Sequence, residues 1–155
     1  MTQEEIKLLL MDLSYRSLYG VKLNIRTQKT PVTLSSVNPE NLCVCYTIEG
    51  YEFISISNIA NCRPYLYPIS SMNNEQIDKL FDILKIDKDG NDEDWIKIND
   101  VTGIKFFLPT GKWIEDMVKV YDYLNSIHID YRGLIDSGLA IDVTTVKIDV
   151  YGSNR

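Results

Sequence analysis

Histidine, cysteine and long apolar runs are scarce in this sequence. The 155 residues include one histidine and three cysteines, and an odd number of cysteines argues against a disulfide framework. The N-terminal segment 1–5 carries acids where a signal peptide carries cations. No apolar stretch approaches the roughly 20 residues that a membrane-spanning helix needs. We therefore expect a cytoplasmic protein that does not enter a membrane.

The motifs of common enzyme classes are also missing. The sequence has no GxxxxGK(S/T) or GxGxxG phosphate loop, no GxSxG elbow and no HExxH pair. Ser126, His128 and Asp130 alternate, but neighbours on one element rarely place a hydroxyl and a carboxylate on opposite nitrogens of a histidine. We predict no catalytic residue and no cofactor, and we keep an enzyme of unrecognised type as an alternative.

Metal binding has a weak basis. Cys43, Cys45, Cys62 and His128 form a chemically adequate zinc set, but their spacing differs from that of the usual zinc knuckle. Cys43 and Cys45 lie two residues apart in an apolar run, so on a strand they would face the same side of the sheet. We predict that the cysteines are small buried hydrophobic residues, and these four residues remain the weak candidates for a metal site.

Positive charge is in deficit, which disfavours nucleic acid as a partner. Sixteen Lys and Arg against 22 Asp and Glu give a net charge of −6. Segment 87–94 holds five acids and one lysine, hence a net charge of −4, which is typical of a solvated loop. With Gly90 at position 6 of an EF-hand loop, Lys85 and Ile96 would occupy two ligand positions, so that motif fails. An irregular calcium site is the alternative.

The rest of the composition is that of a folded protein. Apolar residues make up 45% of the chain and charged residues 25%, which is enough for a hydrophobic core. We expect a single domain over residues 1–155. A division into two lobes, 1–86 and 95–151, joined by the acidic loop 87–94, is the other arrangement that the sequence allows.

Hydrophobic periodicity predicts an α+β fold that begins with a helix. Thr2 to Glu5 has the form of a capping box before an apolar stripe, so a helix should begin there and end before Tyr19. Closely spaced strands then predict a small, strongly bent antiparallel sheet or barrel over about 20–69. The strands are expected at 21–26, 32–34, 42–48, 51–56 and 62–69, the last confined to an edge by Pro64 and Pro68.

Helices and a short hairpin are predicted for the second half. Segments 73–84 and 111–127 each carry an apolar stripe, and short strands are expected at 95–98 and 104–108. Asp130 should cap a short helix that ends at Gly138. Alternation over 146–150 predicts a closing strand.

Tyrosine is abundant, with ten residues. Several of them lie in the β region, where Arg63, Tyr65 and Tyr67 follow one another closely. Three interpretations are open: half-buried sheet residues, a protein-binding face, because Tyr and Arg are enriched in interfaces, or a platform that stacks single-stranded nucleic acid.

Two stretches resemble a known group of proteins. Residues 128–140, HIDYRGLIDSGLA, fit the pattern H-x-D-Y-R-G-L-I-x-x-G-L-A, and residues 63–72, RPYLYPISSM, look like a second shared element. The chain thereby resembles a family of small uncharacterised proteins of gut-bacterial phages and mobile elements. The resemblance implies a phage or prophage origin, and it implies no activity, ligand or catalytic residue.

The longer of these stretches also has a structural interpretation. Tyr131, Leu134 and Ile135 can pack inward on one turn, and Gly138 suits a left-handed position. We expect a docking element that caps the preceding helix, with a partner-binding knob as the alternative. Arg132 should pair with Asp130 or Asp136, or with a carbonyl at a helix end.

Together these features favour a non-enzymatic protein-binding or accessory module whose partner is another protein or an identical subunit. The residues expected at the partner surface are Arg63, Tyr65, Tyr67, Tyr131 and Arg132. The alternative is a role related to nucleic acids, by stacking on the Tyr-rich face or by DNA mimicry through segment 87–94.

Overall fold

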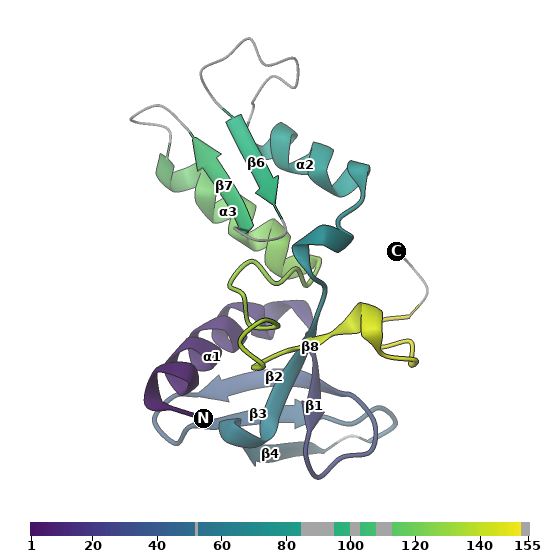
Figure 1. Ribbon diagram of the computed structural model, residues 1–155. Helices are drawn as coiled ribbons and strands as arrows, with labels where there is room; N and C mark the ends of the chain where they lie inside the picture. Colours follow the sequence, from purple (N-terminus) through teal and green to yellow (C-terminus); the bar gives the residue numbers. More distant parts are fainter. Residues whose placement is uncertain (52, 85–94, 100–102, 108–112, 153–155) are drawn as a thin grey trace.

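The computed structural model describes residues 1–51, 53–84, 95–99, 103–107 and 113–152. The chain has mixed α+β content, as the sequence predicts, and is arranged in two parts (Figure 1). We call the part formed by α1 and the six-stranded sheet the sheet lobe. The part formed by α2, α3 and the β6–β7 hairpin is the helical lobe. None of the described helices is long and apolar enough to cross a membrane.

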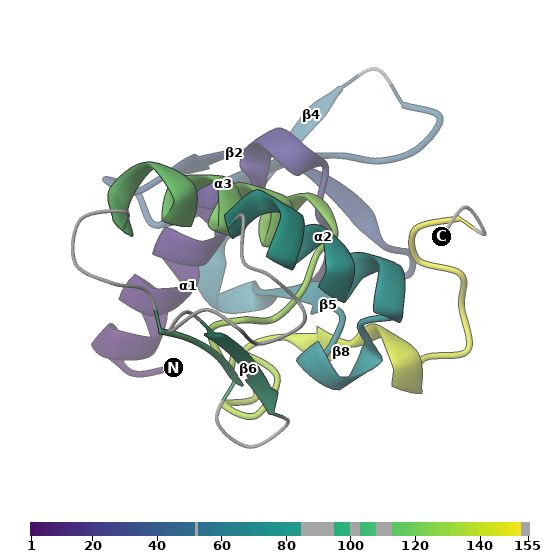
Figure 2. The same ribbon diagram turned by 90° about the horizontal axis from the view of Figure 1, so that it is seen from above.

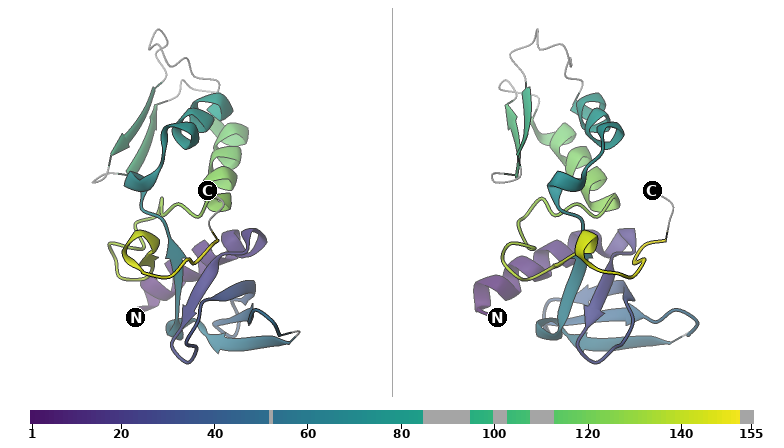
Figure 3. Two further views of the ribbon diagram at one scale, coloured as in Figure 1. Left: turned by 90° about the vertical axis from the view of Figure 1, so that its right-hand side faces the viewer. Right: turned by 45° about the vertical axis from the view of Figure 1, so that its right-hand side comes forward.

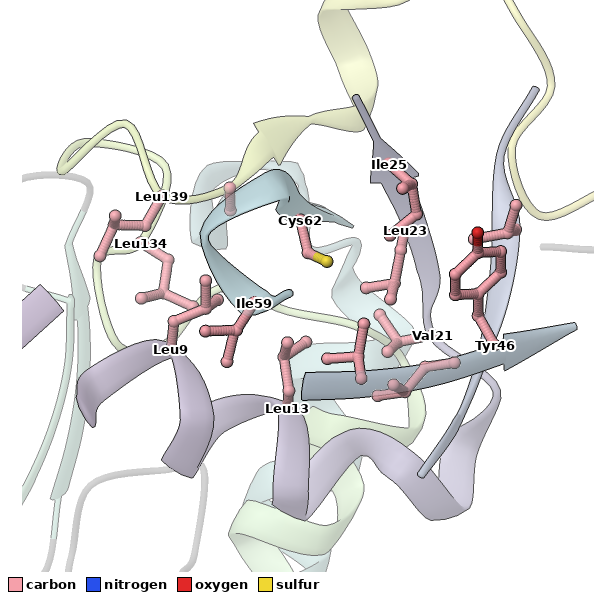
Figure 4. Packing of buried hydrophobic residues seen from close by; sticks show 14 of the residues in the cluster. Leu9, Leu13, Val21, Leu23, Ile25, Tyr46, Ile59, Cys62, Leu134 and Leu139 are labelled. Atoms are coloured by element: carbon pink, nitrogen blue, oxygen red, sulfur yellow. The ribbon is translucent and has the colours of Figure 1, made fainter. Parts of the chain in front are cut away.

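The N-terminal helix α1 (Gln3–Arg16) begins at the predicted capping box. The Thr2 hydroxyl accepts the N–H of Glu5 at 3.2 Å, and the Glu5 carboxylate accepts the N–H of Thr2 at 2.7 Å. Leu9 and Leu13 are fully buried in the core of the sheet lobe, where they lie beside Ile59 (Figure 4). The predicted helix is therefore confirmed, and its apolar stripe faces the sheet.

The sheet is mixed and open, with strand order β4-β3-β2-β1-β5-β8. Neighbouring strands are antiparallel, except that β5 and β8 pair in parallel. The barrel alternative is wrong, because the two outermost strands, β4 and β8, do not pair with each other. The strands are β1 (Lys22–Ile25), β2 (Val32–Asn38), β3 (Cys43–Thr47), β4 (Ile54–Asn58), β5 (Cys62–Leu66) and β8 (Ile141–Asp142).

The prediction that prolines confine β5 to an edge is also wrong. Pro64 pairs with Leu23 of β1, and β8 adds on the other side of β5. Since β8 pairs with Tyr65 and Leu66 but not with Pro64, no described strand lies beside Pro64 on that side. The missing N–H of the proline therefore leaves no hydrogen bond unmade there.

The helical lobe follows the predicted order. It consists of α2 (Asn74–Leu84), the antiparallel strands β6 (Trp95–Asn99) and β7 (Gly103–Phe107), and α3 (Trp113–Ser126). Leu80 and Leu84 of α2 pack with Val120 and Leu124 of α3 in a second hydrophobic core. Figure 2 shows α2 and α3 side by side above α1. The short hairpin and both helices are thus confirmed as elements.

The C-terminal segment differs from prediction in two places. Residues 130–140 form a series of turns instead of a short helix, because Gly133, inside the predicted helix, adopts a left-handed backbone angle with φ +72°; Gly138 is left-handed as predicted, with φ +69°. The closing strand is the two-residue β8, and residues 146–150 form no strand. Alternation alone predicted a strand at 146–150 that does not form. Among the described residues of this tail, Ile141 and Asp142 are the ones that pair with a strand, β5.

The chain crosses between the two lobes twice. Leu66 belongs to the sheet-lobe core and Met72 to the helical-lobe core, and the return passage runs from Ile129 to Leu134. Tyr67 ties the two passages together, since its N–H donates to the carbonyl of His128 at 3.0 Å. Figure 3 shows both passages between the lobes. The predicted joint at 87–94 lies outside the described residues.

Candidate functional site

The residues expected at a partner surface are divided between two places. Arg63 is exposed on β5, but Tyr65 is buried at 5% exposure and Tyr67 is half-buried. The hydroxyl of Tyr65 accepts the Asn24 amide at 3.3 Å, and its carbonyl accepts the hydroxyl of Tyr151. Of these three side chains, Arg63 alone is therefore exposed, and Tyr65 holds the C-terminal tail against the sheet.

Tyr131 and Arg132 lie in a polar cluster between the lobes. Asp12 and Arg16 of α1 are fully buried and form an ion pair, with 2.7 Å between the Arg16 Nε and the Asp12 Oδ2. Arg16 also donates to the carbonyl of Ile129 at 2.8 Å. The Nε of Arg132 lies 3.4 Å from the other Asp12 oxygen. The expected pairing of Arg132 with Asp130, Asp136 or a helix-end carbonyl is therefore corrected: its ionic partner is Asp12.

Two tyrosine rings contact the arginines of this cluster. The Arg132 guanidinium carbon lies 5.0 Å from the ring centre of Tyr131 and 5.4 Å from that of Tyr15. Arg16 lies 5.4 Å from the same Tyr131 ring. These are cation–π distances. The contacts attach α1 to the segment after α3, which fits the docking element that the sequence predicts.

Asp130 organises the turn that follows. Its two carboxylate oxygens accept the N–H groups of Leu134 and Ile135, at 2.9 and 2.7 Å. Burial raises the pKa of Asp130, and these two N–H donors act in the opposite direction. Ser126 donates its hydroxyl to the carbonyl of Tyr123. The Ser126 hydroxyl thus bonds to the backbone of α3, and both Asp130 oxygens bond to the turn that follows.

The four candidate metal ligands do not gather into one site among the described residues, although Cys43 lies near Cys62. Cys43 and Cys45 lie on one face of β3, as predicted, and both are half-buried, whereas Cys62 is buried in the sheet-lobe core. Burial raises the pKa of Cys62 to about 11, so its thiol is a poor metal ligand at neutral pH. His128 stacks on Tyr151 with 4.2 Å between ring centres. Within the described ranges no three His, Cys, Asp or Glu side chains could hold a metal ion.

A groove of about 770 Å³ lies between α2, the end of α3 and the C-terminal tail. Glu75, Asp78, Lys79 and Asp82 line its α2 side, and His128 lies on the opposite side. The α2 side of the groove thus carries three acids and one lysine. Such a wall is typical of a solvated helix face, and it does not by itself define a ligand.

The open edge of the sheet is the most distinctive surface. We define it as strand β4 with Phe53, at the end of the molecule remote from α2 and α3 (Figures 1 and 3). Phe53 is 78% exposed, Ile54 61% and Ile56 68%. No described element pairs with the outer side of β4. Large apolar side chains and unpaired backbone groups are therefore exposed together.

The sheet register explains why these isoleucines are exposed. Ile56 lies opposite Cys45 and Ile54 opposite Thr47, on the face away from α1. The intervening positions, Val44 and Tyr46, point into the core and are buried. Since side chains alternate between faces, the residues of β3 and β4 that share a face with Ile56 lie on the side that none of the described helices covers.

Sequence reasoning missed both the open edge and the buried ion pair. It placed the fourth strand at 51–56, whereas β4 runs over Ile54–Asn58. The available signal was the absence of Asp, Glu, Lys and Arg from residues 53–61. For the ion pair, the signal was an acid and an arginine at i and i+4 beside the apolar stripe of α1.

Comparison with models of known protein families, with curated proteins and with solved structures finds no match for this chain.

Proposed function

We propose that this chain is a non-enzymatic protein-binding module that accepts an extended segment of a partner on the open edge of its sheet. The observation that carries the proposal is the exposure of Ile54 and Ile56 on an outermost strand whose outer side pairs with no described element. Natural proteins protect such strands with charges, prolines or covering elements. Residues 53–61 contain no charged side chain and no proline.

Strand addition uses two features of this edge, its outward backbone groups and its exposed isoleucine side chains. The N–H of Ile59 donates to the carbonyl of Leu42, and hydrogen-bonding alternates along an antiparallel pair. The backbone groups of Ile54 and Ile56 therefore face outward, away from β3. An added strand would pair with these groups, and its side chains would pack against the two isoleucines.

The phage-type resemblance remains part of the proposal. It suggests that the chain originates from a phage or mobile element and binds a protein that it meets in the host cell. Arg63, Tyr67, Tyr131 and Arg132 remain predicted partner contacts, of which Arg63 is exposed. The burial of Tyr65 favours a structural role for that side chain.

Single-strand nucleic acid binding has less support than protein binding. Tyr46 and Tyr65 are buried, at 4% and 5% exposure, whereas Tyr51 is 67% exposed, so only part of the tyrosine set offers a ring face on which a base could stack. The net charge of −6 is also unfavourable for phosphate binding. The acidic segment 87–94, on which DNA mimicry would depend, lies outside the described residues.

The test is a selection from a displayed library of random peptides against the immobilised protein. We expect enriched peptides with alternating apolar residues that bind wild type, lose binding to Ile56→Lys and keep binding to Val118→Lys. Val118 is a matched control, because it is 56% exposed on α3. Failure to enrich any peptide, or equal binding to Ile56→Lys, would overturn the proposal.

A further inference from the structure

We infer that the segment which occupies the open edge is β4 of a second copy of this chain, so that two sheets join into one across a two-fold axis. This inference rests on the proposed function, since it identifies the partner for the same edge. It follows from the backbone geometry of β4, the order of its side chains and its lack of charge.

The outward backbone groups fit an antiparallel copy of the same strand. Ile54 and Ile56 both present their N–H and C=O groups to the open side, as the register with β3 requires. With a two-fold axis at Ser55, Ile54 lies opposite Ile56 of the second copy, and Ile56 lies opposite Ile54. Each of these pairs can exchange two backbone hydrogen bonds.

The side chains are self-complementary in this register. All four isoleucines lie on the same face of the joined sheet, in two directly opposed pairs, where apolar cross-strand contacts stabilise pairing. Cys45 and its counterpart flank them, because Cys45 lies opposite Ile56 within each copy. Thr47 lies opposite Ile54 in each copy, so each pair of isoleucines is flanked by Cys45 of one copy and by Thr47 of the other. A two-fold interface of this kind requires a patch that complements itself.

The lack of charge on β4 permits a second copy at this place. Two chains that each carry a net charge of −6 repel each other over most approaches. The run 53–61 has no charged side chain, so the strands can meet without juxtaposing like charges directly. Acidic or basic partners gain nothing from charge attraction at β4 itself. The strand thus fits a neutral, alternating apolar segment, and β4 is such a segment.

The first experiment measures molecular mass by light scattering across a concentration series. Wild type is expected to approach twice the 17.8 kDa of the chain as concentration rises. Ile56→Lys should remain a monomer, because two added cations would face the opposed isoleucines. Val118→Lys should dimerise like wild type. A wild-type monomer throughout, or an Ile56→Lys dimer, overturns the inference.

A second variant pair tests the register. The opposed Ser55 positions would be a non-hydrogen-bonded pair with Cα atoms about 4.5 Å apart, within the range that a disulfide spans. Mild oxidation of Ser55→Cys should give a covalent dimer, with the link between the two substituted positions identified by peptide mass spectrometry. Ser57→Cys should not form a covalent dimer, since the two copies of position 57 are about 13 Å apart along the strands in this register. Equal cross-linking of both variants overturns the register.

The outcomes separate the two proposals. A wild-type monomer that still enriches edge-dependent peptides refutes the second copy and leaves strand addition standing. A monomer that enriches no peptide refutes both. Immobilisation at low density keeps the copies apart during the peptide selection, so dimerisation does not block the edge.

Discussion

Replacing Arg16 with methionine should strongly destabilise the fold, because this arginine is the charged centre of the interface between the lobes. Its side chain and that of Asp12 are both fully buried. It pairs with Asp12 at 2.7 Å and donates to the carbonyl of Ile129 at 2.8 Å. Methionine keeps much of the apolar stem but removes both hydrogen bonds and the positive charge.

The size of the expected stability loss follows from the Asp12 charge that Arg16→Met leaves in the interior. Removing one member of a buried ion pair typically costs about 3–5 kcal/mol, because the other charge remains in the interior. Arg132 still lies 3.4 Å from the second oxygen of Asp12 and offsets part of that loss. We therefore expect the free energy of unfolding of Arg16→Met to fall by about 3 kcal/mol, the low end of this range.

Urea unfolding at neutral pH, followed by circular dichroism, measures this loss. The double variant Asp12→Leu with Arg16→Met removes both charges and should recover most of the stability, since apolar replacement of a buried pair is often neutral. Arg63→Met is the control, because Arg63 is exposed and its loss should change stability by less than about 0.5 kcal/mol. If Arg16→Met loses less than about 1 kcal/mol, or the double variant loses as much as the single one, the buried charge is not the cause.

Two further predictions concern titration and thiol chemistry. Since burial raises the folded-state pKa of Asp130, its contribution to stability is present below the unfolded pKa and is lost as pH rises through the folded pKa. Urea titrations of wild type and Asp130→Asn should therefore be compared at several pH values between the unfolded and folded pKa of Asp130. The unfolding free energy of wild type should fall relative to that of Asp130→Asn as pH rises through this range. A relative gain would contradict the raised pKa of Asp130. Burial raises the pKa of Cys62 to about 11, so iodoacetamide at neutral pH should modify the half-buried Cys43 and Cys45 first. Mass spectrometry of the native protein should find Cys62 unmodified until urea is added, and early labelling of Cys62 would refute its burial.

Local sequence signals identified most of the elements. The capping box placed the start of α1 at Thr2, and its apolar stripe identified the buried face. Alternating residues predicted the first four strands to within a few positions, and periodicity predicted α2, α3 and the hairpin between them. The two cysteines of β3 lie on one face as their spacing required. These features depend on neighbours within a few residues, which the sequence shows directly.

The open edge illustrates what local signals could not supply. Alternation predicts that every second residue of a strand faces a core, but it does not reveal which strand is outermost or which face lacks a helix. Ile54 and Ile56 have the sequence pattern of buried residues and are exposed, because β4 is the terminal strand and α1 covers the other face.

The sequence by itself determined that this protein is an α+β chain with an N-terminal helix, a β-rich first half and a Gly138 turn with a left-handed backbone. Only the tertiary structure decided that the sheet is open, that Tyr65 is buried and that Arg132 reaches Asp12. The physical reason is distance along the chain. Helix caps and turns form among neighbouring residues, whereas strand order and a buried ion network join residues that only folding brings together.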